Sequence, residues 1–270
     1  MRQERKRAGA DGGGGLLERP LPPRSLIASL LLGMRPPRIA GSRLVEWCAL
    51  FGVAEGTARV ALSRMVERGE LVSADGVYEL AGPLRRRQPV QDWSLAPELT
   101  PWRGEWLLGV VHANARSAPE RAALRDAARH LRLAELREGV WARPDNLPRA
   151  AAPAAAWVVA DAQCAWWTAR PERPGDALAA ELFDPDAWAE RAVSLRVRLD
   201  AASELARSGE GAAIAEAFVV GAAALTHIRA DPLLPRELCG ARWPGEPLRA
   251  AYRDYQATFA AALRDWFRAR

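Results

Sequence analysis

The chain has 270 residues, of which 49% are apolar and 26% are charged, a balance that is typical of soluble globular proteins. No stretch is expected to reach the ~18 apolar residues of a membrane span, so the composition argues against a membrane protein. The formal charge of +5 is uneven, because residues 1–87 carry a net +6 and the remainder a net −1. A basic first third is typical of a nucleic-acid-binding module, although a basic surface kept for solubility gives the same imbalance.

The N-terminal segment is expected to lack a fold of its own. Residues 1–23 are charged, then glycine-rich, then proline-rich, and this composition predicts a disordered arm. The apolar run Leu26–Leu32 could imitate a signal peptide, but it is short and follows Ser25, a good helix cap. We therefore expect this run to be a helix of a soluble protein.

Residues 24–82 are expected to form a winged helix-turn-helix domain. Apolar residues at helical spacing predict helices over 25–33, 42–51 and 55–68. Two short extended runs, 71–74 and 77–80, flank Asp75-Gly76, which is the strongest short signal for a β-hairpin. Three helices followed by a hairpin form a compact unit that presents its third helix to the major groove of DNA.

The outer face of the predicted third helix carries side chains suited to DNA. Thr57, Val60, Ser63, Arg64 and Glu67 lie away from its apolar face, with Arg59 beside them. The candidates for contact with DNA are Thr57, Arg59, Val60, Ser63 and Arg64. An arginine can pair bidentately with guanine, and hydroxyls can bond bases or phosphates. Arg85 and Arg86, in a run of three arginines after the hairpin, are candidates for contacts with the DNA backbone. Each arginine could instead be a solvated cation, a linker residue or a partner in an intraprotein salt bridge.

The rest of the chain is predicted to be a linker, an α+β domain and a helical domain. Residues 83–101 are the predicted linker. Within the middle domain, 102–175, a helix is expected over 119–133 and strands are expected at 106–111, 139–141, 157–160 and 164–169. Within the C-terminal domain, 176–270, helices are expected over 176–183, 185–207, 211–229 and 247–270. The expected fold class is therefore multidomain α+β.

The sequence contains no convincing catalytic or metal-binding motif. The three histidines are isolated, and the three cysteines, Cys48, Cys164 and Cys239, lack metal-binding spacing. Widely spaced cysteines of odd number predict a reduced, cytoplasmic protein. No phosphate-binding glycine loop or nucleophile elbow is present, so we expect neither a cofactor nor a catalytic residue.

Five segments resemble, in the right order, the PaaX family of phenylacetate-catabolism repressors. They are 51–80 with Leu62-Ser63-Arg64-Met65, Trp102–Trp106 with Gly139–Pro144, Asp231–Pro235, and Trp243-Pro244-Gly245. The resemblance implies a homodimeric repressor with a winged helix, a ferredoxin-like middle domain and a helical C-terminal domain. It also implies release from the DNA operator when an acyl-CoA or aryl-CoA thioester binds.

An aryl-CoA effector would need apolar surface and donors for its phosphates. The candidates after Gly139 are Trp141, Arg143, Trp166 and Arg170, because arginine suits phosphates and tryptophan can hold an apolar acyl group. The alternative is that these tryptophans form part of a hydrophobic core.

Two other functions stay open at this point. The first is a nucleic-acid-processing enzyme, a metal-dependent nuclease with an appended winged helix; the lack of a convincing carboxylate pair favours the regulator instead. The second is a winged helix used only for protein interaction, which the basic N-terminal third disfavours.

Overall fold

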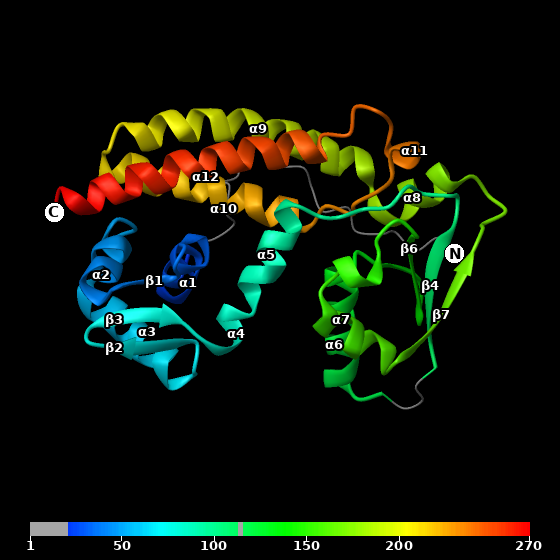
Figure 1. Ribbon diagram of the computed structural model, residues 1–270, viewed down its shortest axis with the longest axis horizontal. Coiled ribbons are helices and arrows are strands. Elements are labelled where there is room, and N and C mark those ends of the chain that lie inside the picture. The colour runs from blue at the N-terminus through cyan, green and yellow to red at the C-terminus, as the bar shows by residue number, and fades with distance from the viewer. Residues whose placement is uncertain (1–20, 113–115) are drawn as a thin grey trace, which may run out of the picture.

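The computed structural model describes residues 21–112 and 116–270. Figure 1 shows two lobes on one side of a layer of long helices, α9 (Pro185–Arg207), α10 (Gly211–Arg229) and α12 (Gly245–Arg268). One lobe is N-terminal, and the other is formed by the middle of the chain. The chain is therefore a mixed α+β protein with two small sheets and a helical C-terminal region.

The N-terminal lobe has the three helices and the hairpin that the sequence predicts. Its elements are α1 (Pro23–Gly33), β1 (Arg38–Ala40), α2 (Gly41–Ala49), α3 (Glu55–Glu67), β2 (Leu71–Ala74) and β3 (Val77–Leu80). The strands pair antiparallel in the order β1-β3-β2. Asp75 and Gly76 both have positive φ, 50° and 74°, as the favoured two-residue hairpin turn requires. The arm expected over 1–23 lies outside the described residues as far as residue 20, and Pro23 already belongs to α1.

The segment 83–101, predicted as a linker, is largely helical. Its first part forms α4 (Gly82–Arg85) and α5 (Arg87–Leu95). Pro89 lies in the first turn of α5, where its missing N–H is not needed for a helical hydrogen bond. Gln88, Gln91, Ser94 and Leu95 are buried at helical spacing. The linker interpretation is therefore wrong for this part, because α5 is a packed helix that contacts α10.

The middle lobe is a four-stranded antiparallel sheet covered on both faces. Its elements are β4 (Trp106–Val111), α6 (Ala118–His130), β5 (Ala134–Arg137), β6 (Val140–Pro144), α7 (Ala154–Asp161) and β7 (Cys164–Ala169). The strand order is β5-β6-β4-β7. Helices α6 and α7 cover one face through Leu124 and Trp157, and α8 (Gly175–Phe183) covers the other through Leu178.

One predicted strand of this lobe is a helix. The run 157–160 is expected to be extended, but it lies within α7. Ala156, Trp157 and Ala160 are its buried residues, the spacing of one helical face, whereas Val158 is 70% exposed. The prediction is wrong because a short run of apolar residues gives the same sequence pattern in a buried strand and in a short buried helix.

The C-terminal helices closely match their predicted bounds. Helices α9, α10 and α12 all pack against one another, and Gly221 lets α10 approach α12 closely, since an added Cβ would lie 2.4 Å from Cε1 of Tyr255. Helix α10 is also long and apolar enough to cross a membrane, judged by length and composition only. The expectation that no stretch is long and apolar enough for a membrane span is therefore wrong. Half of the apolar segment of α10 is, however, buried inside the protein.

The N-terminal lobe and the C-terminal helices share one hydrophobic core. Ile214 and Phe218 of α10 and Trp266 of α12 belong to the same buried cluster as the apolar faces of α1–α3. Trp47 of α2 is central, because its ring lies 4.8 Å from that of Phe218 in an edge-on arrangement. The regions 24–82 and 176–270 are therefore not separate hydrophobic units.

Candidate nucleic-acid interface

Helix α3 presents a polar and basic face to solvent. Ala58, Leu62 and Met65 anchor the helix in the core of the N-terminal lobe. The five residues predicted to face DNA are all exposed: Thr57, Arg59, Val60, Ser63 and Arg64. A rigid helix with its anchor residues buried can hold these side chains at fixed positions, as base recognition requires.

The two arginines of this face differ in their partners. Arg59 forms an ion pair with Glu55 at 2.7 Å, and both side chains are 65% exposed. Such an exposed pair contributes little stability, but it gives Arg59 the intraprotein role that was the alternative to DNA contact. Within residues 21–112 and 116–270, the Arg64 side chain takes part in no hydrogen bond or ion pair. Arg64 is therefore the better candidate for a base contact.

The arginines after the hairpin are also exposed. Arg85, at the end of α4, pairs with Glu79 of β3 at 2.6 Å. Arg86 lies between α4 and α5 and is exposed. The hairpin itself exposes Val72 and Val77. Arg85 thus has an intraprotein partner next to the hairpin, whereas the Arg86 side chain forms no ion pair with any residue that the structure describes.

The four residues proposed for an effector do not come together in a pocket. Trp141 is buried in the core between the sheet and α6 and α7. Trp166 donates from Nε1 to Asp161, and Arg170 is 68% exposed near Glu105. None of the four lines either of the two pockets described below. The core alternative therefore accounts for Trp141.

Arg143 has a structural role. It is 1% exposed and donates to the carbonyls of Pro144 and Leu131 and to Oδ1 of Asn146. Burial lowers the pKa of its guanidinium to about 9. With these donors already bonded inside the protein, Arg143 is not placed to hold a phosphate, and the sequence-based role for it is corrected.

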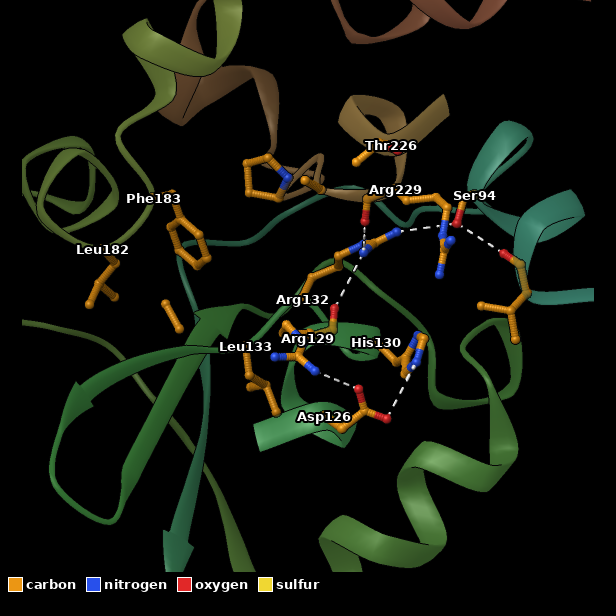
Figure 2. A pocket seen from close by; sticks show the side chains of 14 residues that line it. Ser94, Asp126, Arg129, His130, Arg132, Leu133, Leu182, Phe183, Thr226 and Arg229 are labelled. Atoms are coloured by element: carbon orange, nitrogen blue, oxygen red, sulfur yellow. Dashed lines mark hydrogen bonds and ion pairs between the residues drawn. The ribbon is translucent and has the colours of Figure 1, made fainter. Parts of the chain in front are cut away.

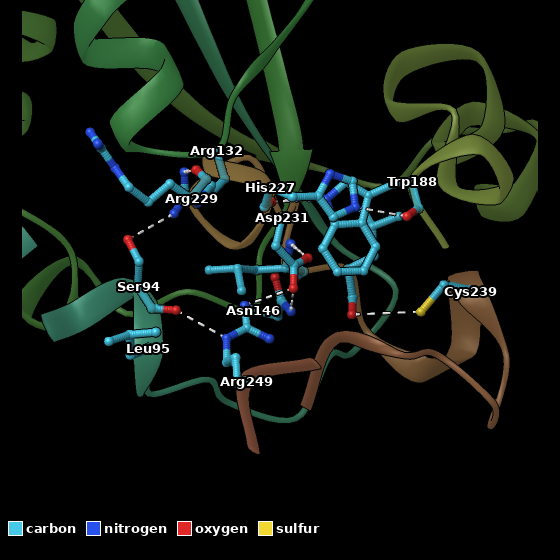
Figure 3. A network of polar contacts seen from close by, with 12 residues as sticks. Ser94, Leu95, Arg132, Asn146, Trp188, His227, Arg229, Asp231, Cys239 and Arg249 are labelled. Atoms are coloured by element: carbon cyan, nitrogen blue, oxygen red, sulfur yellow. Dashed lines mark hydrogen bonds and ion pairs between the residues drawn. The ribbon is translucent and has the colours of Figure 1, made fainter. Parts of the chain in front are cut away.

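A buried polar network joins the middle lobe and α5 to the helical layer (Figure 3). Asp231, after α10, and Arg249 of α12 form an ion pair at 2.7 Å, with side chains 1% and 5% exposed. Arg249 also donates to the carbonyl of Ser94 in α5, and Asn146 donates to the carbonyl of Leu233. The network therefore connects α5, α12, the loop after α10 and the loop after β6.

The same junction explains three of the sequence segments that carried the resemblance. Asp231 accepts from the backbone N–H of Leu233, which has a positive φ of 55°. A Cβ on Gly245 would lie 2.8 Å from Oδ2 of Asp231 and 2.7 Å from Nε1 of Trp243. Arg143 reaches the junction through Asn146. Sequence reasoning missed Ser94 and Arg249, although Asp231–Pro235 and Trp243–Gly245 pointed to this place.

Two pockets lie beside this junction. The first, of about 550 Å³, lies between α5, α6, α8 and the end of α10 (Figure 2). The second, of about 730 Å³, lies between α1, α10 and α12. Thr226 and Arg229 line both.

Metal ligands and cysteine thiols are the remaining candidates for chemistry among the described residues. Across residues 21–112 and 116–270, no group of three or more histidine, cysteine, aspartate or glutamate side chains could hold a metal ion. Burial raises the pKa of Cys48 to about 11, so its thiol is not activated as a nucleophile.

Comparison with known proteins places the chain in a family. The family model for PaaX-like protein matches residues 22–83, and that for the PaaX-like protein C-terminal domain matches residues 183–269. No curated protein matches the chain. Among solved structures, the uncharacterized protein Rv0674 from Mycobacterium tuberculosis is 40% identical, with a TM-score of 0.67, over 90% of this chain and 97% of that one. The chain therefore belongs to the PaaX-like family, which is known for transcriptional regulation.

Proposed function

We propose that this protein is a DNA-binding transcriptional repressor that contacts its operator through α3. The observation that carries the proposal is the exposed face of α3, on which Arg64 has no intraprotein partner within the described residues. Membership of a family of transcriptional regulators and the net +6 of residues 1–87 support the same function.

The N-terminal lobe acts in this proposal as a winged helix-turn-helix. Three helices followed by the β1-β3-β2 sheet give that arrangement, with β2 and β3 as the wing. The middle lobe, with β-α-β-β-α-β connectivity, is interpreted as ferredoxin-like. Val60, half exposed on α3, can contact a thymine methyl group, while Thr57 and Ser63 can bond bases or phosphates.

Replacing Arg64 with alanine is expected to weaken specific DNA binding by about 1–3 kcal/mol, because a bidentate contact with guanine is lost. The measurement is a fluorescence titration of the full-length protein against a duplex selected by it from genomic fragments. Arg125→Ala is the matched control, since Arg125 is exposed on α6 and remote from α3. Equal affinities of Arg64→Ala and the unaltered protein would remove Arg64 from the interface.

The repressor is expected to be a homodimer. One α3 offers few base contacts, and two-fold pairing doubles them while matching an inverted repeat with half-sites about 34 Å apart or a multiple of this. The contacts between subunits are expected in the middle or C-terminal region, because α3 and the wing are occupied with DNA. Light scattering at micromolar concentration should give twice the chain mass of 29.5 kDa; a monomer mass with and without operator would contradict the dimer.

An acyl-CoA or aryl-CoA thioester is the proposed effector. A 100-fold loss of DNA affinity needs about 2.7 kcal/mol of coupling, which is within the usual allosteric range. Linkage requires the operator to weaken thioester binding by the same factor. Calorimetry with and without operator tests this, and equal thioester affinity in both states would exclude the effector mechanism while leaving DNA binding intact.

A further inference from the structure

The smaller pocket lies where the middle lobe, α5 and the helical layer meet. Its walls come from α5, the end of α6 and the residues after it, α8 and the end of α10, as Figure 2 shows. Its volume of about 550 Å³ lies within the range of small-molecule sites. Because three regions of the chain contribute to it, a molecule bound there would contact all of them.

This pocket contains more positive than negative charge. Three arginines, Arg129, Arg132 and Arg229, line it against a single carboxylate, Asp126. Asp126 is already engaged, since it lies 2.6 Å from Arg129 and 3.8 Å from His130. Within the part of the chain that the structure describes, neither Arg132 nor Arg229 has an ion-pair partner. Two cations of the pocket therefore have no carboxylate in direct contact, although Asp231 acts on Arg132 and Asp126 on Arg229 from farther away.

Arg132 is the most unusual of these residues. It is only 8% exposed and lies 5.0 Å from the ring of Trp93. Its terminal nitrogens donate to the carbonyls of Arg229 and, at 3.3 Å, of Arg129, and at 3.4 Å to Oγ of Ser94, while its buried Nε has no partner in the described structure. Burial lowers the pKa of Arg132 to about 10. The Trp93 ring and the neutral acceptors leave part of its donor capacity unused, and an anion in the pocket would supply both a charge and a further acceptor.

Apolar side chains form the other part of the pocket. Leu182 and Phe183 of α8 and Leu133 lie on the side shown at the left of Figure 2. An anion with an attached ring or chain could place its charge beside the arginines and its apolar part against these residues. A simple inorganic ion would use only the first of these two features.

We propose that this pocket binds a small organic anion, with a phosphate or carboxylate group held by Arg129, Arg132 and Arg229. Its apolar part lies against Phe183 and Leu182. The second part of the proposal rests on the proposed function. The bound anion changes the affinity of the N-terminal lobe for DNA, because α5 leads from the pocket to that lobe. In this proposal the effector binds in this pocket and not at Trp141, Arg143, Trp166 and Arg170.

Calorimetry on DNA-free full-length protein tests the site. The probes are phenyl phosphate, benzoate, inorganic phosphate and phenol. Phenyl phosphate or benzoate should bind, and whichever binds more tightly identifies the acidic group. Inorganic phosphate should bind at least tenfold more weakly because it buries no apolar surface, and phenol should show no binding because it lacks the charge. Tightest binding by phenol, or no binding by either organic anion, would overturn the proposal.

Variants locate the bound probe. Arg229→Gln and Arg129→Gln change exposed side chains and should weaken binding of the organic anion by about tenfold or more, as expected for a lost charge-assisted hydrogen bond. Arg132→Gln should abolish binding, and its circular dichroism shows whether it folds; if it does not, the other two variants decide. Arg125→Gln, outside both pockets, and Arg264→Gln, which lines only the larger one, should bind normally. Loss in Arg264→Gln with normal binding by Arg129→Gln would contradict the location.

The regulatory part has a separate readout. Saturating the protein with the tighter-binding organic anion should shift its affinity for the selected duplex at least fivefold, the lower end of typical allosteric coupling. Unchanged DNA affinity would overturn the regulatory part while the calorimetric result stands. A protein that binds the anion but no specific duplex would instead disprove the proposed repressor function.

Discussion

Asp231→Ala is expected to lower the free energy of unfolding by about 3–5 kcal/mol. The substitution leaves Arg249 charged and nearly fully buried without its partner. It also removes the acceptor for the backbone N–H of Leu233. Because Arg249 additionally bonds the carbonyl of Ser94, the damage should reach the contact between α5 and α12. Denaturant unfolding followed by circular dichroism measures the effect.

Two comparisons separate the buried charge from other causes. Asp265→Ala breaks an ion pair on the same helix α12, but that pair is exposed, so the change should be about 0–1 kcal/mol. The double variant Asp231→Leu, Arg249→Met removes both charges and should recover part of the lost stability. An Asp231→Ala protein as stable as Asp265→Ala would mean that the junction does not support the fold as described.

Trp47→Ala is expected to cost about 3–5 kcal/mol of stability, the usual range for a buried aromatic residue. Trp47 is fully buried, and its ring meets Phe51, Phe218 and Phe259 edge-on. Its Nε1 also donates to the carbonyl of Leu26. The variant should therefore loosen the N-terminal lobe from α10 and α12, which limited proteolysis would detect as earlier cleavage between the lobes.

The control for this variant is another tryptophan. Trp167→Ala removes a side chain that is 61% exposed on β7, so the free energy of unfolding should change by about 0.5 kcal/mol or less. Trp47→Phe keeps an aromatic ring and should lose less than the alanine variant. If Trp47→Ala and Trp167→Ala were equally stable, the shared core would not hold the N-terminal lobe to the helical layer.

The predicted helices and the hairpin were correct where local signals agree with packing. Asp75 and Gly76 favour positive φ through their own local preference, so these two residues alone predict the hairpin. In α3, apolar residues recur at helical spacing because one face must enter the core. Helices α9 and α10 begin at Pro185 and Gly211, and a proline at the first helical position is a signal for the start of a helix.

The errors arose where tertiary contacts decide the outcome. β1 has only three residues and exists through its pairing with β3, so no local pattern reveals it. Helix α5 contains a proline that would break it anywhere but in its first turn. The run around Trp157 is too short for its periodicity to distinguish a helix from a strand.

The candidate site was predictable only in part. Exposure of Arg64 follows from its place opposite Ala58 and Leu62, but the pairing of Arg59 with Glu55 depends on side-chain conformations that the sequence does not specify. Arg132 and Arg229 are 97 residues apart in sequence and meet only because α6 ends beside α10. A pocket assembled from such distant segments leaves no spacing pattern in the sequence.

Selection of genomic DNA fragments by the purified full-length protein, followed by sequencing, tests the central claim most directly. The account predicts enrichment of an inverted repeat with half-sites on one face of the duplex, binding that weakens steeply as salt is raised, and loss of that enrichment in Arg64→Ala but not in Arg125→Ala. Fragments without any shared sequence, bound equally by the unaltered protein and by Arg64→Ala, would contradict it.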